Sequence, residues 1–510
     1  MAKTVVIIGG GVAGLSAGIH AQLSGLESII VERHHILGGL CTAWDRKGYH
    51  FEGCLHYIVG FSERYHFHEM WKDLGMTREP YFPEDIGRIQ TPDGQEIVMY
   101  TDSEVLRDHW CSISPSDEPL INQLVRWIKL CTYFNPPINK PMEKVGLRDL
   151  LHLRGQFFAF SRMFFHLKKQ TCQEFANKFC HPGIRQLLTQ ANGFGTFPLI
   201  WLVMILSRLS IRDAGFPLGG STALIEDLEK RYRSLGGKVR YRCEAAEVVV
   251  EQNTAVGVKL TTGEVIKADE VISSGDYRYA SQILLGDKHT PKVVKKMLEQ
   301  KEIYPSYIQI SLGVATDLRR RPHTFFVREM PESNLPIGRM VVKHYSFDSS
   351  MGSSHQSTVI ALIDTEYSYW KSINTYEKQE SYNKKKQAIL DYVLPTIYDF
   401  YPEIKGKVEV TDIATPTTYE RYTFGWEGSC QGWLANKSNF GRVLPSEFPS
   451  LKHFSLCGQW LVPGGSVHRS AQTGRYVVGS ICKRRGWSCL SVSTSTDEQL
   501  TELRQPTRMY

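Results

Sequence analysis

The apolar and polar positions of this chain change period several times, and residues 5–39 show the clearest pattern. Residues 5–8 form a continuous apolar run, which predicts a buried β-strand. A glycine turn and an amphipathic helical pattern follow, and a second apolar run over residues 29–31 ends on Glu32. This order predicts the β-α-β unit that opens a dinucleotide-binding fold.

The glycine turn has the spacing G-x-G-x-x-G. Gly9 allows a sharp turn, Gly11 lets the backbone approach a pyrophosphate, and Gly14 lets the helix pack closely on the strand. The amides that open the helix, at Val12 and Ala13, would face the phosphates, because the helix dipole favours anions there. The turn therefore predicts a dinucleotide site.

The residues at and after the end of the second strand indicate whether the dinucleotide is FAD or NAD. Glu32 stands where a carboxylate accepts hydrogen bonds from ribose hydroxyls, and it is followed by Arg33, the pair Gly38-Gly39 and Leu40. The pattern resembles the extended fingerprint of the large FAD-dependent family that holds amine oxidases, phytoene desaturases, carotenoid isomerases and retinol saturase. In that family the second glycine pair lets a loop pass close to the flavin end of FAD, and arginine usually follows the pair. The resemblance implies FAD as the cofactor.

Three later segments resemble the same family in the same order. Residues 216–260 read as a glycine turn, a long amphipathic helix and a β-hairpin, and the resemblance implies that Ala245 holds the adenine through its main chain. Residues 268–276 resemble the strand that rejoins the dinucleotide domain. Residues 454–467, with a helix over about 470–484, resemble the closing motif beneath the flavin. The resemblance implies further cofactor contacts from Gly458, Gln459, Ser466 and Val467.

Residues 50–60 (HFEGCLHYIVG) indicate the branch of the family. They resemble the F-D-x-G-x-H-Y-x-G segment of the retinol saturase and carotenoid isomerase relatives. The resemblance implies that His56 and Tyr57 lie near the flavin. There either could hold a proton for a carbon centre after hydride transfer, or both could simply shape the pocket. Three further residues are expected in the substrate pocket: Trp460, His468 and Arg469.

A chain of 510 residues, 42% hydrophobic and 22% charged, is expected to form two domains. The expected fold class is α/β, with a discontinuous Rossmann-type FAD-binding domain. A second α+β substrate domain would contain a mixed or antiparallel sheet and a helical, apolar segment. The expected boundaries are 1–87, 211–299 and 445–486 for the FAD-binding domain, 88–210 and 300–444 for the substrate domain, and 487–510 for a disordered tail.

Within the substrate domain, alternating patterns predict strands over 306–314 and 359–363, and a helix over about 377–398. An unusually aromatic helix is expected over 157–167, followed by Lys168-Lys169. Such a helix could lie in a membrane interface, line a lipid tunnel or be a core helix. Periodicity does not separate these three interpretations.

Charge and cysteine content narrow the classes of partner. The net charge of +7 is modest, and no basic cluster is interleaved with aromatic residues, so we expect no nucleic-acid partner. Eleven cysteines without a CxxC pair predict reduced thiols, no metal site and no redox-active dithiol. The longest apolar run, residues 197–206, is about half the length that spans a bilayer. We expect a cytoplasmic protein, with membrane association as the open alternative.

No second G-x-G-x-x-G follows a predicted strand, so electrons must come from or go to an unidentified donor or acceptor. The family resemblance and the apolar middle of the chain predict an enzyme with a hydrophobic small-molecule substrate. It would saturate or desaturate a C–C bond of a carotenoid- or retinoid-like polyene by hydride transfer at flavin N5. Three alternatives stay open: a redox-neutral carotenoid cis-trans isomerase, a flavin amine oxidase and a non-catalytic flavin-binding partner protein.

Overall fold

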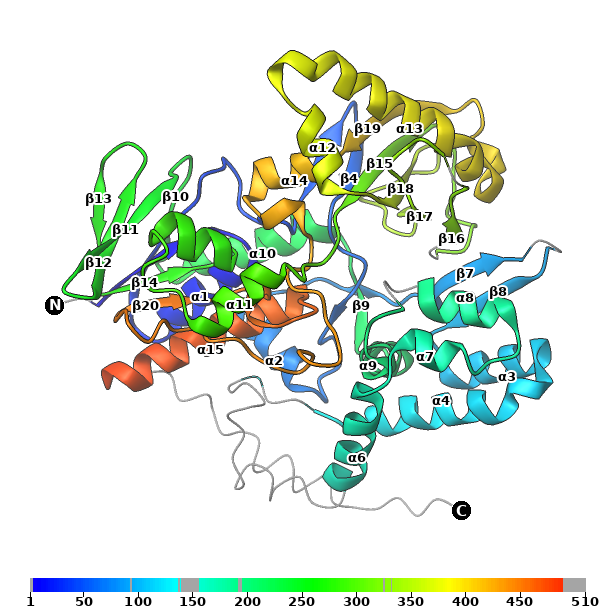
Figure 1. The fold of residues 1–510 in the computed structure, drawn as a ribbon, viewed down its shortest axis with the longest axis horizontal. Coiled ribbons are helices and arrows are strands. Elements are labelled where there is room, and N and C mark those ends of the chain that lie inside the picture. The colour runs from blue at the N-terminus through cyan, green and yellow to red at the C-terminus, as the bar shows by residue number, and fades with distance from the viewer. Residues whose placement is uncertain are drawn as a thin grey trace.

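A five-stranded parallel sheet forms one part of the protein (Figure 1). The computed structural model describes residues 3–91, 94–135, 138, 156–190, 195–323, 326–331 and 333–488. The sheet buries nearly continuous apolar strands, as parallel sheets covered on both faces do. Its strands, in spatial order, are β10 (Lys238–Arg240), β2 (Glu27–Val31), β1 (Thr4–Ile8), β14 (Glu270–Ser273) and β20 (Phe454–Leu456).

Three helices pack together beside this sheet. Helix α1 (Val12–Leu23) packs against α15 (Val467–Arg485) and α10 (Gly220–Ser234). A three-stranded antiparallel sheet, at the left of Figure 1, extends from the same region. It consists of β11 (Ala245–Glu251), β12 (Thr254–Leu260) and β13 (Val265–Lys267). The parallel sheet and these helices confirm the Rossmann-type fold expected from the sequence.

A seven-stranded mixed sheet forms the second part, with the order β19-β15-β18-β17-β16-β7-β8. Side chains alternate along β15, so that Ile308, Ile310 and Leu312 join an apolar core with α13 (Gln379–Phe400). Helices α12 (Tyr367–Ile373) and α13 lie over that face in Figure 1. The strands are β7 (Asp85–Gln90), β8 (Glu96–Tyr100), β15 (Tyr307–Val314), β16 (Phe326–Glu329), β17 (Arg339–His344), β18 (Ser357–Asp364) and β19 (Val408–Ala414).

A helical group completes the second part. It contains the aromatic helix α6 (Gln156–Lys168), which was expected from the sequence, and the helix α9 (Leu199–Ser210), which begins within the apolar run at 197–206. In the part of the chain that the structure describes, no helix has both the length and the apolar character needed to cross a membrane. The other helices of the group are α3 (Ser103–Ile113), α4 (Glu118–Cys131), α7 (Cys172–Ala176) and α8 (Pro182–Gln190).

Shorter elements connect the two parts. Strands β5 (Ile58–Val59) and β6 (Pro80–Tyr81) both pair with β9 (Ala214–Pro217). Strands β3 (Ala43–Arg46) and β4 (Tyr49–Glu52) form a separate hairpin. The remaining helices used below are α2 (His66–Asp73), α11 (Lys292–Gln300) and α14 (Pro416–Thr423).

Several details differ from the sequence expectations. Strand β7 begins at Asp85, ahead of the expected boundary at 88, and there it already pairs with Tyr100 on β8 of the mixed sheet. Helix α15 begins at Val467 rather than near 470, because Ser466 has extended backbone angles and stands directly before the first turn. The domain boundaries themselves stay a prediction.

Two further expectations concern the C-terminal region and the cysteines. Trp487 belongs to the described structure, with Lys3 Nζ lying 5.0 Å from its ring centroid, whereas residues 489–510 of the expected tail lie outside the described residues. Cys482 is disulfide-bonded, so the expectation that all cysteines are reduced is wrong at this position. Among the residues that the structure covers, no group of His, Cys, Asp and Glu could hold a metal ion.

Candidate functional site

The glycine turn adopts the geometry expected of a dinucleotide cradle. Gly9 has a φ of +95°, and its N–H donates to the Val31 carbonyl at 2.9 Å. A Cβ at Gly14 would lie only 2.0 Å from the Gly9 carbonyl oxygen, so glycine is required for α1 to start this close to β1. A Cβ at Gly11 would meet nothing closer than the Gly38 carbonyl oxygen, at 3.6 Å. The backbone at Gly11 is therefore open on one side.

The second glycine pair packs directly against this turn. The Gly38 N–H donates to the Gly10 carbonyl at 2.9 Å, and Gly11 and Gly38 form a parallel bridge. Gly38 and Gly39 both have positive φ, at 121° and 62°, which glycine adopts without strain. The pair and Leu40 thus form the second wall beside the opening of α1.

Glu32 is held in place at the end of β2 by two main-chain donors. Its Oε2 accepts from the Gly10 N–H at 2.7 Å and its Oε1 from the His34 N–H at 2.8 Å. Arg33 lies beside it, with its guanidinium 3.4 Å from the Phe424 ring centroid and a hydrogen bond to the Arg421 carbonyl. Glu32 is 8% exposed and lines the cavity, so its carboxylate is fixed at the cavity wall.

Ala245 opens β11, as the resemblance implied. Its carbonyl accepts a hydrogen bond from the Tyr279 hydroxyl at 3.0 Å, which leaves a second lone pair on that oxygen. The rings of Tyr279 and Phe424 stack at 5.5 Å, with an angle of 23° between their planes. Aromatic faces and a main-chain carbonyl together suit a flat heterocycle such as adenine.

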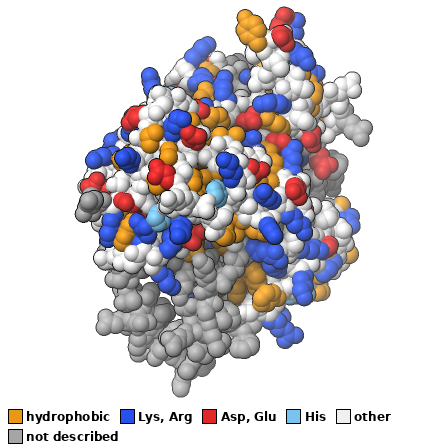
Figure 2. Space-filling model, turned by 60° about the vertical axis from the view of Figure 1, so that its left-hand side comes forward, with side chains coloured by type: hydrophobic (Ala, Val, Ile, Leu, Met, Phe, Trp, Pro, Cys, Tyr) orange, Lys and Arg blue, Asp and Glu red, His pale blue; other side chains and the backbone are white. Residues whose placement is uncertain are grey.

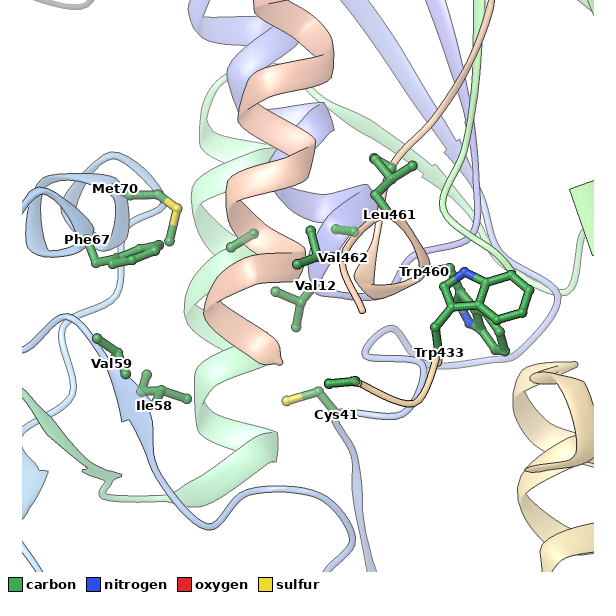
Figure 3. Close-up of a cluster of buried hydrophobic side chains, with 14 of the residues drawn as sticks. Val12, Cys41, Ile58, Val59, Phe67, Met70, Trp433, Trp460, Leu461 and Val462 are labelled. Carbon is green, nitrogen blue, oxygen red and sulfur yellow. The ribbon is translucent and has the colours of Figure 1, made fainter. Parts of the chain in front are cut away.

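A second helix N-terminus, that of α15, faces the cavity after the C-terminal glycine turn. Gly458, with a φ of +117°, donates its N–H to Thr473 Oγ1 at 2.8 Å, and Gln459 and Trp460 follow. The Ser470 N–H bonds the Ser466 carbonyl at 2.8 Å, so the amides from Val467 to Arg469 precede the first bond of the α15 ladder. Figure 3 shows Trp460 beside Trp433, with ring centroids 5.1 Å apart, and Val462 next to Val12 of α1.

The loop that carries His56 and Tyr57 is organised by Glu52. The Glu52 carboxylate is 1% exposed and accepts hydrogen bonds from the N–H groups of Cys54 and Leu55, at 2.8 and 2.9 Å. It also accepts from the main chain of Ser221 at the start of α10, at 2.8 Å. The acid at position 52 therefore fixes the turn that leads into His56 and Tyr57.

These elements enclose one cavity of about 750 Å³. Every residue that the sequence suggested for the cofactor, for catalysis or for the substrate pocket lines it, except Gly14. Gly14 acts behind the wall, through the close contact of α1 with β1 described above. The structure thus brings together segments that lie more than 400 positions apart in the sequence, such as Gly9 and Ser466.

The part of the cavity beyond the glycine turns is rich in aromatic side chains, beside aliphatic and a few charged ones. Helix α6 contributes Phe160, Phe164 and Phe165, and Phe160 stacks on Phe134 with centroids 4.0 Å apart. Phe165 is 61% exposed, so α6 reaches from the cavity to the surface. These contacts favour the lipid-tunnel interpretation of this helix over the core-helix interpretation.

Ionisable groups in and near the cavity are strongly affected by burial. Burial and the cationic side chain of Lys343 lower the pKa of His56 well below its ordinary value, and burial raises the pKa of Tyr57. Both side chains are therefore neutral at physiological pH. Burial, with Arg469 and Arg208 nearby, lowers the pKa of His468 to about 3. Arg469 itself donates to Gln472 Oε1 at 2.6 Å.

A buried lysine behind this region was not found from the sequence. Lys343 on β17 is 2% exposed, and its Nζ lies 4.1 Å from the ring centroid of Tyr345. Burial lowers its pKa from the ordinary 10.5 to about 7, although the Glu52 carboxylate opposes that shift. In the sequence Lys343 occupies an ordinary alternating strand position, and nothing there shows that both faces of the strand are covered.

Lys343 gives a prediction about the pH dependence of stability. Between about pH 7 and 10.5 the unfolded chain holds a proton at this lysine that the folded chain lacks, so its contribution makes folding more favourable as the pH rises. A Lys343→Met variant is expected to be more stable than the wild type by a few kcal/mol below pH 7, and the difference should shrink towards about pH 10. Urea unfolding of both proteins at the two pH values measures it. A difference that does not vary with pH would show that Lys343 does not titrate in this way.

Sequence reasoning missed other residues for the same reason. Tyr279, Phe424, Arg339 and Asp364 all line the cavity, but they come from four separate elements or loops. Glu52 was noticed only as part of a motif, and its role in fixing the loop appears from its hydrogen bonds. No periodicity or short motif marks these positions.

The basic side chains on the face shown in Figure 2 are not gathered into one patch. Figure 2 shows Lys and Arg side chains spread over one face among acidic, apolar and neutral groups. Elsewhere in the described chain many basic side chains are paired, such as Arg240 with Glu264 and Arg484 with Glu447 and Glu270. This face therefore offers no continuous basic stripe.

The chain belongs to the flavin-containing amine oxidoreductase family, a family of FAD-dependent oxidoreductases. The sequence pattern described as "Flavin containing amine oxidoreductase" matches residues 12–482, which is most of the chain. The match begins at the first residue of α1 and ends within α15, and so it includes the N-termini of both helices that face the cavity.

Individual relatives are distant. The chain is 23% identical to prolycopene isomerase of Daucus carota, over 82% of this chain and 70% of the relative. It is 22% identical to all-trans-retinol 13,14-reductase of Danio rerio, over 94% of this chain and 86% of the relative. A solved oxidoreductase from Methanosarcina mazei has the same fold, with a TM-score of 0.59, 16% identity and coverage of 94% of this chain and 100% of that one.

Proposed function

We propose that the protein binds FAD and transfers a hydride between the flavin and a C–C bond of a hydrophobic polyene, such as a carotenoid- or retinoid-like isoprenoid. The observation that carries the proposal is that one continuous cavity joins the dinucleotide cradle to a chamber rich in aromatic side chains. The names of the relatives support the substrate class, since they refer to a carotenoid isomerase and a retinol reductase.

The residues of the cradle fit FAD. The open side of Gly11 and the first amides of α1 would take the pyrophosphate, where the helix dipole favours negative charge. Glu32, already fixed by two main-chain donors, would accept from the ribose hydroxyls. The Ala245 main chain, with Tyr279 and Phe424, would hold the adenine. The opening of α15 would stabilise negative charge at the flavin N1–C2=O edge.

The chain's own residues orient the substrate, exclude water from the cavity and supply a proton. When bound, the flavin accepts or donates a hydride at N5. Aromatic side chains of α6 and α9 exclude water and hold an extended apolar chain in the chamber. His56 and Tyr57 are both neutral and each carries a proton that can be exchanged with a carbon centre. Glu52 keeps their loop in place.

Substitution of the two proposed proton carriers tests their role. We expect Tyr57→Phe or His56→Ala to lower the rate at which a polyene oxidises the reduced flavin by about a hundredfold, with FAD content unchanged. Tyr376→Phe, at a tyrosine that is 99% exposed, is the matched control and should behave as wild type. If both variants react at the wild-type rate with FAD fully bound, these residues only shape the pocket.

A redox-neutral isomerisation is the second candidate function. The isomerase and reductase relatives are almost equally distant, at 23% and 22% identity. Product analysis separates the two functions, because an isomerase leaves the mass of the polyene unchanged. The amine oxidase and non-catalytic alternatives, the electron partner, the cytoplasmic location and membrane association stay predictions.

A further inference from the structure

One face of the mixed sheet forms a wall of the cavity, and its strand register places polar side chains in a row. Met340 on β17 is paired with Ile363 on the antiparallel strand β18. The residue before Met340, which is Arg339, therefore stands opposite the residue after Ile363, which is Asp364. Asp364 is in turn paired with Tyr307 on β15. Directly opposed residues of antiparallel strands point to the same face. All three residues of this row line the cavity.

Arg339 and Asp364 form an ion pair within that wall. Arg339 Nη2 lies 3.2 Å from Asp364 Oδ1, and Arg339 Nη1 donates to the Gln190 carbonyl at 2.6 Å. Their side chains are 14% and 32% exposed, so both are sheltered yet reachable from the cavity. Burial raises the pKa of Asp364, and the Arg339 guanidinium opposes that shift. A donor and an acceptor are therefore held side by side.

The next row along the same face is apolar. Val341 and Leu362 are paired across β17 and β18, two residues further along each strand, and both line the cavity. A charged pair beside such a wall gains less from water than it would on an open surface. Pockets for apolar ligands typically carry a few such polar groups, which fix the orientation of the ligand.

We propose that Arg339 and Asp364 form a subsite that holds a hydroxyl group at one end of the substrate's apolar chain. A hydroxyl matches the pair because it donates to the carboxylate and accepts from the guanidinium at the same time. A hydrocarbon end would shield the two charges from water and supply no hydrogen bond in return. A carboxylate end would be repelled by Asp364. The inference rests on the proposed function, since it names the polyene class as an alcohol.

Equilibrium binding to the FAD-loaded protein tests the subsite. Three ligands of the same chain length are compared: a polyene alcohol, the corresponding hydrocarbon and the corresponding carboxylic acid. Their binding is followed through quenching of tryptophan fluorescence, because Trp201 and Trp460 line the cavity. We expect the affinity for the alcohol to be at least about tenfold higher than for either of the other two ligands, because a charge-assisted hydrogen bond contributes that much binding free energy.

Two independent variants identify the residues responsible. Arg339→Met and Asp364→Asn should each remove most of the alcohol's advantage and leave hydrocarbon affinity within about twofold. Asp364→Asn should also improve binding of the acid, because it removes the repelling charge. The matched control is Arg328→Met, which breaks the 3.0 Å pair of Arg328, on β16 of the same sheet, with Asp399 of α13; neither residue lines the cavity. Thermal unfolding and flavin content check that each variant is folded.

The outcomes separate the subsite from the proposed function. Equal binding of alcohol and hydrocarbon by the wild type would overturn the subsite while the polyene function stands. Equal weakening of all three ligands by both variants would also overturn it, since the pair would then support only the shape of the wall. If none of the three ligands binds, the proposed function is contradicted, and the subsite with it.

Discussion

A Gly11→Ala variant is expected to fold normally and to bind FAD at least about tenfold more weakly than the wild type. The added Cβ would meet the Gly38 carbonyl oxygen at 3.6 Å, an ordinary contact, and Gly11 has a φ of −71° that alanine adopts without strain. The same methyl group would occupy the side from which the pyrophosphate approaches the backbone. Flavin titration of the apoprotein measures the affinity, and thermal unfolding without FAD measures the fold.

Gly14→Ala provides the contrast to this variant. Its Cβ would lie 2.0 Å from the Gly9 carbonyl oxygen, so α1 must move away from β1 and the apoprotein should be destabilised. Gly11→Ala should leave apoprotein stability unchanged. Wild-type flavin affinity in Gly11→Ala would mean that the pyrophosphate does not lie against this turn.

Gly474→Ala is expected to destabilise the protein by about 1–3 kcal/mol. Gly474 lies in α15 where it crosses α1, and a Cβ there would be 2.5 Å from the Ala13 carbonyl oxygen and 2.8 Å from the Ala17 nitrogen. These are backbone atoms, so the helices must separate rather than a side chain turn aside. Because the N-terminal residues of both helices line the cavity, flavin affinity should fall as well. Urea unfolding and flavin titration measure the two effects.

Gly479 in the same helix is the matched control. A Cβ there meets nothing within 4 Å, and alanine is preferred over glycine in a helix by roughly 0.5–1 kcal/mol. Gly479→Ala should therefore be slightly stabilising and should leave flavin affinity unchanged. If the two variants changed stability alike, close packing of α15 on α1 would not be the reason for glycine at 474.

The dinucleotide cradle could be predicted because its information is local. Strand β1, the glycine turn, α1 and Glu32 follow one another within one short stretch, and each has a strong signal in residue type or period. The strands β14 and β20 and the helix α15 were found through family resemblance. The structure confirms the fold and brings all of the proposed cofactor residues except Gly14 to one cavity.

The chemistry of the chamber could not be predicted in the same way. Arg339 and Asp364 become neighbours only through the register of β17 with β18, which no local pattern specifies. Lys343 is buried beside Tyr345 and near Glu52, which come from other parts of the chain or from the turn after its strand, so its burial depends on tertiary packing. Tyr279 and Phe424 meet although they lie far apart in the chain. Long-range pairing, rather than local sequence, decides which of these side chains meet.

The most direct test of the central claim is an anaerobic reaction of the reduced flavin. The FAD-loaded protein is reduced chemically, excess reductant is removed, detergent-dispersed polyenes are added and the absorbance of oxidised flavin is followed. We expect recovery of that absorbance together with a product two hydrogens heavier, or, for a desaturase, bleaching of the oxidised protein by the same ligands. No change of the flavin in either direction with any polyene would contradict hydride transfer between flavin and a polyene as the function of this protein.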